Sequence, residues 1–179
     1  MTIHLARHGQ TAYNHEGRFQ GHSPVPLDVT GREQAVALAE VAAGVEIVSL
    51  WCSPLLRARQ TADVVAARIG LRPIEDARFV ETDTGDWTDR SFAEIRAEDP
   101  EGFRRFEVSD PAFRYPGGES FAEQSDRVQA GLHDLRAKPG ALPALVVCHR
   151  GVIRLALAVA TGDPTAGGRE IGNATLVTL

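Results

Sequence analysis

Short apolar runs alternate along this chain with stretches in which apolar residues recur every three or four positions. The runs at residues 3–6, 47–52 and 144–148 are continuous, and each is followed by polar or turn-forming residues. That pattern is typical of short strands buried on both faces of a sheet. Residues 173–179 predict a final strand, and residues 73–80 predict a weaker one.

Helical periodicity fills the intervals between these strands. The predicted helices cover residues 30–43, 55–69, 120–135 and 152–160. Glu33 stands three positions after Thr30, which predicts a capping box at the start of the first helix. Gly70 and Gly162 follow two of the other helices and predict their ends. Strands that alternate with helices predict an α/β fold, which we expect to be a three-layer α/β/α sandwich with a mostly parallel central sheet.

One segment interrupts this alternation. Residues 99–119 contain three prolines, the pair Gly117-Gly118 and three phenylalanines among charged residues. This composition predicts a short helix and a loop that cover one end of the sheet. We therefore expect a single domain over residues 1–179, in which residues 88–118 form a lid that contacts the substrate.

Composition places the chain among ordinary globular proteins. Its 179 residues are 43% hydrophobic and 24% charged, which is enough for a substantial core. The net charge is −5 and no basic run is present, so nucleic acid is not the expected partner. Lys138 is the single lysine, and the positive charge is therefore almost wholly arginine, the better bidentate ligand for phosphate.

No feature of the sequence indicates a membrane or an export signal. No apolar run approaches the ~20 residues of a membrane span, and no basic segment followed by an apolar stretch begins the chain. Cys52 and Cys148 both lie in apolar strand-like runs, which favours two buried free thiols in a cytoplasmic protein. The sequence does not determine the oligomeric state.

Candidate chemistry gathers just beyond the predicted strands. Ligands bind beyond the carboxyl ends of parallel strands. The first predicted strand is followed by Arg7-His8-Gly9, the strand at residues 47–52 by Ser53-Pro54 with Arg57 and Arg59, and the strand at residues 144–148 by His149-Arg150-Gly151. Guanidinium groups and helix N-termini bind phosphoryl oxygens, and an imidazole can act as nucleophile or carry a proton. The residues therefore predict a phosphoryl site at this edge of the sheet.

The motifs LARHGQTAYNHEGRFQGHSPVPL, SPLLRARQTA, PGGES and VVCHRGVIR, in this order and nearly from end to end, resemble the histidine phosphatase superfamily, whose members include cofactor-dependent phosphoglycerate mutases. The resemblance implies that His8 is the nucleophile that takes up phosphate. It also implies that Arg7, Arg57 and His149 complete the phosphate pocket. Asn14, Gln20 and Gly21 would add contacts from the loop after the first strand.

The resemblance further implies an acid. In the family a glutamate precedes a Gly-x-Trp element and donates a proton, and in FVETDTGDW that glutamate is Glu81. The residues by themselves leave Asp83 and Asp86 as alternatives.

Two stretches depart from the family pattern. Arg150 follows the second histidine where the family usually has glycine, and Gly151 comes one position later. Arg150 either reaches toward the substrate, as a substrate-binding residue, or points to solvent. Thr-Asp-Arg-Ser follows Trp87 where relatives often carry Glu-Gly, which leaves the substrate side of the pocket undefined.

These features predict a phosphomonoesterase that acts on small phosphate esters through a phosphohistidine. Neighbouring guanidinium groups should lower the pKa of His8 and keep it neutral for attack. The arginines can neutralise developing charge, so no metal and no other cofactor are expected. A phosphoglycerate mutase is the alternative, but the covering segment is short, whereas a mutase has to shield its intermediate from water.

The sequence also leaves two further hypotheses. Cys148 and Arg154 have the C-x5-R spacing of cysteine-dependent phosphatases, although the loop between them lacks the small residues that let backbone amides converge on an anion. A catalytically silent phosphate-binding module is the second hypothesis, and the complete set of His8, His149 and Glu81 with Arg7 and Arg57 argues against it.

Overall fold

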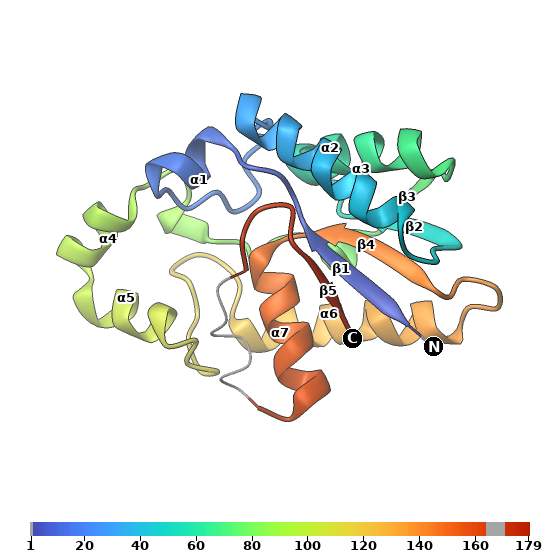
Figure 1. The fold of residues 1–179 in the computed structure, drawn as a ribbon. Coiled ribbons are helices and arrows are strands. Elements are labelled where there is room, and N and C mark those ends of the chain that lie inside the picture. The colour runs from blue at the N-terminus through green and yellow to red at the C-terminus, as the bar shows by residue number, and fades with distance from the viewer. Residues whose placement is uncertain (1, 164–170) are drawn as a thin grey trace.

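The computed structural model describes residues 2–163 and 171–179, which build a mixed, mostly parallel sheet (Figure 1). Its strand order is β3-β2-β4-β1-β5. The strands are β1 (Ile3–Arg7), β2 (Ser49–Cys52), β3 (Pro73–Glu75), β4 (Ala144–Cys148) and β5 (Leu176–Thr178). Of these strands, β5 alone runs antiparallel to its neighbour, β1. Every predicted strand is present, and three of them are shorter than the apolar pattern suggested.

Helices cover both faces of the sheet, as the α/β pattern predicted. The helices α2 (Val29–Ala43) and α3 (Leu56–Ile69) pack on one face, and α6 (Phe121–Ala137) and α7 (Arg150–Thr161) on the other (Figure 1). Leu5 and Val146 point into the layer of α6 and α7, whereas Ala6 and Leu145 point into the layer of α2 and α3. Because both faces are buried, the strands read as continuous apolar runs.

The predicted capping box at the start of α2 is wrong. Asp28 is the N-cap residue, and its carboxylate accepts a hydrogen bond from the Gly31 amide at 2.7 Å. This aspartate satisfies a free amide in the first turn of the helix, so Thr30 and Glu33 have no capping role to fill. Asp28 and Thr30 are both good caps by residue type, and only the path of the preceding chain selects between them.

Three helices lie beyond the carboxyl end of β1, at one end of the molecule (Figure 1). They are α1 (Ala12–Glu16), α4 (Phe92–Glu98) and α5 (Pro100–Glu107). The sequence predicted a single helix within residues 99–119, which is α5, and missed α1 and α4. An aromatic cluster of Phe19, Trp87, Phe103, Phe113, Tyr115 and Phe121 joins this end to the body.

Both cysteines are buried free thiols, as predicted. Within the described residues, no helix combines the length and the hydrophobicity that a crossing of the bilayer requires.

Candidate active site

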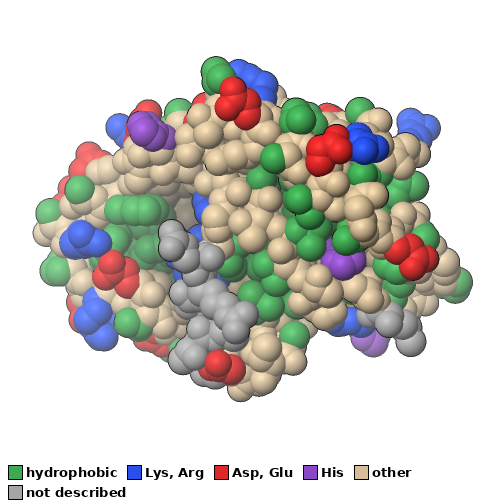
Figure 2. All heavy atoms as spheres, viewed as in Figure 1, with side chains coloured by type: hydrophobic (Ala, Val, Ile, Leu, Met, Phe, Trp, Pro, Cys, Tyr) green, Lys and Arg blue, Asp and Glu red, His purple; other side chains and the backbone are tan. Residues whose placement is uncertain are grey.

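A pocket opens beyond the carboxyl ends of the parallel strands, between the body and the end that carries α4 and α5. Figure 2 shows the surface hollowed here, with hydrophobic side chains on one side and basic ones deeper in. The predicted residues that line it are Arg7, His8, Asn14, Gln20, Gly21, Arg57, Glu81 and Arg150. His149 is buried beside His8, with 5.2 Å between the ring centroids. The structure therefore brings the predicted set together.

His8 is held with one ring nitrogen available for chemistry. Its ring lies 2.7 Å through Nδ1 from the Gly9 carbonyl oxygen, which can only accept, so Nδ1 carries the proton and donates. The lone pair is therefore on Nε2. Burial, and then the charges of Arg57 and Arg7, keep the pKa of His8 well below its usual value. The ring is neutral at physiological pH, as the sequence predicted.

The backbone of His8 is fixed by β4 on one side and by the turn that precedes β5 on the other. Its amide donates to the Cys148 carbonyl at 3.0 Å, and its carbonyl accepts from the Ala174 amide at 3.2 Å. The Asn173 side chain also donates to this carbonyl, at 3.1 Å. The nucleophile candidate is thus part of the sheet edge and not of a free loop.

Two guanidinium groups accompany His8. Arg57, in the first turn of α3, is 1% exposed and donates to the carbonyls of Gly21 at 2.9 Å and Ser23 at 3.2 Å. Arg7 donates to the Ile171 carbonyl at 2.7 Å. The Nε atoms of both arginines are buried and have no partner among the described residues. Burial lowers each pKa to about 10, so both groups stay charged at neutral pH.

The stretch after β1 shapes this pocket through its backbone and side-chain amides. Gly21 has a φ of 46°, and a Cβ there would lie 2.5 Å from the Thr84 hydroxyl, so the turn that presents its carbonyl to Arg57 requires glycine. The side-chain oxygen of Asn14 accepts from the Thr11 amide at 3.1 Å, and that of Gln20 accepts from the Thr11 hydroxyl at 2.9 Å. The amide nitrogens of these side chains remain as donors.

His149 is the residue that precedes α7. Its Nε2 lies 2.8 Å from the hydroxyl of Ser53, which also accepts from the Leu55 amide at 3.2 Å. The Ser53 hydroxyl can donate its proton to Nε2, and in that tautomer the imidazole proton is on Nδ1. Nδ1 is buried without a partner in the described part of the chain. Burial, and next the charge of Arg57, keep the pKa of His149 well below its usual value.

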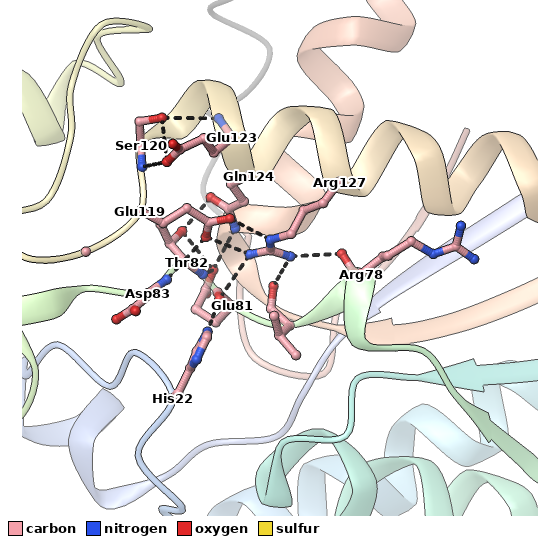
Figure 3. Close-up of polar contacts among 12 residues, drawn as sticks. His22, Arg78, Glu81, Thr82, Asp83, Glu119, Ser120, Glu123, Gln124 and Arg127 are labelled. Carbon is pink, nitrogen blue, oxygen red and sulfur yellow. Dashed lines mark hydrogen bonds and ion pairs between the residues drawn. The ribbon is translucent and has the colours of Figure 1, made fainter.

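Glu81 is the acid that the structure places in the pocket. Its carboxylate accepts from the Thr82 amide at 3.0 Å. It also accepts from the Gln124 side chain and from the Gly151 amide, at 3.3 Å each. Figure 3 shows Thr82 and Gln124 beside Glu81. A Cβ on residue 151 would lie 2.4 Å from a Glu81 oxygen, so only glycine allows this approach. Asp83 and Asp86 are exposed and do not line the pocket.

Arg127 holds the segment that carries Glu81, and no sequence pattern indicated this role. From α6 its guanidinium donates to the carbonyls of Arg78 and Val80 at 2.8 Å each and of Glu81 at 3.1 Å (Figure 3). It also forms an ion pair with Glu119, of the PGGES motif, at 2.6 Å. Both side chains are mostly buried, with exposed fractions of 21% and 15%. This contact fixes the main chain from which Glu81 projects.

Gln124 was missed as well, although its position contained a signal. It lies three residues after Phe121 and four before Val128, on the buried face of α6. A polar residue on that face requires a partner. Its partners are Glu81 and Thr82.

Two residues that the sequence suggested for the site do not line the pocket. Arg59 pairs with Glu75 at 3.0 Å and is half-exposed away from the pocket. Cys148 is buried in the apolar core under α6 and α7, and burial raises the pKa of its thiol. A thiol in that state is a poor nucleophile, which argues against the cysteine-dependent alternative.

Comparisons with known proteins find similar sequences and similar structures. The sequence profile of the "Histidine phosphatase superfamily (branch 1)" matches residues 3–179. "Probable phosphoglycerate mutase GpmB" of Salmonella choleraesuis (strain SC-B67) is 34% identical over 172 residues, which cover 96% of this chain and 80% of that protein. A mycobacterial glucosyl-3-phosphoglycerate phosphatase in complex with VO3 superposes with a TM-score of 0.90 at 32% identity, covering 99% of this chain and 90% of that one. The alpha-ribazole phosphatase from Shigella flexneri superposes with a TM-score of 0.86 at 29% identity, covering 99% and 89%.

Proposed function

The chain belongs to branch 1 of the histidine phosphatase superfamily, and we propose that it is a phosphomonoesterase that hydrolyses small phosphate esters through a phosphohistidine at His8. One observation carries the proposal. The Nδ1 proton of His8 is committed to the Gly9 carbonyl, which leaves the Nε2 lone pair in a pocket that also contains Arg7, Arg57 and Glu81.

In the first step, His8 Nε2 attacks phosphorus and the ester P–O bond breaks. Glu81, in its protonated form, transfers its proton to the departing alkoxide. The products of this step are the free alcohol, phosphorylated His8 and the Glu81 carboxylate. The Gly9 carbonyl stabilises the positive charge on the ring because it accepts from Nδ1.

In the second step, water attacks phosphorus and the N–P bond breaks. Glu81 accepts a proton from that water, which restores its acid form and releases inorganic phosphate. His8 returns to its neutral state, which its lowered pKa favours.

The phosphoryl oxygens would accept hydrogen bonds from the buried donors around His8. The Nε groups of Arg7 and Arg57 and the Nδ1 group of His149 have no partner among the described residues. Asn14 and Gln20 would add their side-chain amides, and Gly21 would act by holding Arg57. The arginines offset the charge that develops on the phosphoryl group, so the proposed reaction needs no metal ion and no other cofactor.

We assign substrate selection to the lid at residues 88–118. Phe92, Phe106 and Tyr115 from this part of the chain line the outer pocket. Two short helices and a loop make a small cover, which favours access of water over retention of an intermediate. This supports a hydrolase over a mutase.

Phosphoglycerate mutase activity is the second candidate, since a relative 34% identical carries that name. Incubation with 3-phosphoglycerate, followed by phosphorus NMR, separates the two. A hydrolase releases inorganic phosphate and glycerate, whereas a mutase accumulates 2-phosphoglycerate.

Turnover of p-nitrophenyl phosphate tests the proposal in wild type, His8→Ala and Cys148→Ser. We expect activity in wild type and in Cys148→Ser, and its loss in His8→Ala. Activity that depends on Cys148 would overturn the assignment of the nucleophile. A wild-type protein that turns over no phosphate ester would instead favour the silent binding module.

A further inference from the structure

Two arginines in the pocket are not used by the proposed chemistry. Arg150 and Arg154 lie one turn apart on α7, so their side chains share one face of the helix. Both line the pocket that contains His8 and Glu81. Neither guanidinium group has a hydrogen-bond or ion-pair partner within residues 2–163 and 171–179.

This lack of partners is unusual in the chain. Most described arginines form ion pairs with Asp or Glu, namely Arg18, Arg59, Arg68, Arg78, Arg90, Arg96, Arg104, Arg105, Arg114 and Arg127. Of the others, Arg7, Arg57, Arg150 and Arg154 line the pocket. Guanidinium groups without a carboxylate partner therefore concentrate where the substrate binds.

The charges of the pocket exceed what one phosphoryl group needs. The pocket is lined by four guanidinium groups that form no ion pair with a described residue. It is lined by a single carboxylate, that of Glu81. A phosphate dianion offsets two of the four charges, and Glu81 is neutral when it is ready to donate its proton. Two positive charges are then left over, those of Arg150 and Arg154.

The position of Arg154 beside Arg150 opposes the charged state of Arg154. Burial, and next the nearby charge of Arg150, lower the pKa of the half-buried Arg154. Arg150 acts in the same direction on the pKa of Arg7. A bound anion between Arg150 and Arg154 would offset both the desolvation and the repulsion.

We propose that Arg150 and Arg154 form a subsite for a second anionic group, a carboxylate or a second phosphate, so that the preferred substrate is a phosphate ester with a further anion. This proposal rests on the proposed phosphatase function and names its substrate class. A planar guanidinium pair suits either anion because each presents two oxygens to the fork.

Three substrates on one three-carbon frame test the subsite: propyl phosphate, 3-phosphooxypropionate and 1,3-propanediol bisphosphate. We expect wild-type kcat/KM to be about tenfold or more higher for at least one of the two substrates with a second anion than for propyl phosphate. The larger preference identifies the anion as carboxylate or phosphate. Arg154→Met should remove most of that preference, and Arg150→Met should reduce it.

Arg136→Met is the matched control, because Arg136 is an exposed arginine in the last turn of α6. It should leave the preference unchanged. Equal values of kcat/KM for all three substrates in wild type, or a preference that survives in Arg154→Met, would overturn the proposal. An equal loss for all three substrates in Arg154→Met would show that Arg154 serves the reacting phosphoryl group and would also overturn it.

Calorimetry on His8→Ala separates this proposal from the proposed function, because we expect that variant to bind phosphate esters without hydrolysing them. With Arg154 present, the compound with the preferred second anion should bind about tenfold tighter than propyl phosphate. Addition of Arg154→Met should abolish the difference. This result would support the subsite even if wild type hydrolysed none of the three esters, and its absence would refute the subsite even if all three were hydrolysed.

Discussion

Lowering the pH should destabilise the fold through the two histidines at the strand ends. His8 and His149 are both fully buried and neutral, with pKa values well below the usual value. In the unfolded chain each imidazole takes up a proton near pH 6.5. The unfolded state therefore binds more protons than the folded state below that pH, so the free energy of unfolding falls as the pH falls.

The magnitude follows from this difference. Each imidazole that is protonated only in the unfolded state lowers the free energy of unfolding by about 1.4 kcal/mol one pH unit below 6.5. Between about pH 7.5 and about pH 5.5 the pair should lower it by about 3 kcal/mol. The loss begins near the unfolded pKa and continues until the pH reaches the folded values.

Urea unfolding followed by far-ultraviolet circular dichroism measures this loss at the two pH values. His8→Asn removes one of the two imidazoles, and we expect the pH dependence of the free energy of unfolding to fall by about half in that variant. A change below about 1 kcal/mol in wild type would refute the reasoning, because the two rings would then be protonated in the folded state as well.

Further predictions concern the acid and its supports. Gly151→Ala should lower kcat by about 100-fold with little loss of thermal stability, because the new methyl group meets the movable Glu81 carboxylate. Steady-state kinetics measures the loss of kcat, and a melting curve measures the thermal stability. Glu81→Gln should lower kcat/KM for propyl phosphate by about 10²–10⁴-fold, and kcat/KM for p-nitrophenyl phosphate much less, since nitrophenolate leaves without a proton. Equal losses of kcat/KM for the two substrates would contradict the role of Glu81 as the acid. Arg127→Met should lower the free energy of unfolding by about 3 kcal/mol and slow propyl phosphate more than p-nitrophenyl phosphate. Arg127→Lys should restore part of the stability and little of the rate, because one ammonium group cannot reach three carbonyls.

The sequence was most informative where one physical constraint dominated. The core of the sheet requires continuous apolar runs, and parallel strands end at one edge, so the amino-acid pattern alone could place Arg7, His8 and His149 together. The motif PGGES was also present, but its glutamate pairs with Arg127 and does not line the pocket.

The sequence was least informative where tertiary contacts decide. Arg127 bonds to main-chain carbonyls, which have no sequence signature, so nothing distinguished it from a solvated arginine on a helix. The helices α1 and α4 are short, with five and seven residues, and stability of such helices comes from packing more than from propensity. Glu81 could be chosen over Asp83 only by family resemblance, because the choice depends on which side chain turns toward the pocket.

The position of the phosphoryl group on the enzyme tests the central claim most directly. Wild type and His8→Ala are mixed with radiolabelled p-nitrophenyl phosphate and quenched rapidly in alkali and in acid. We expect one label that survives alkali, is lost in acid, is absent from His8→Ala and is recovered after digestion as the Nε2 isomer of phosphohistidine at position 8. Label on the Nδ1 nitrogen would contradict the hydrogen bond to Gly9, and label on Cys148 would contradict the histidine route itself.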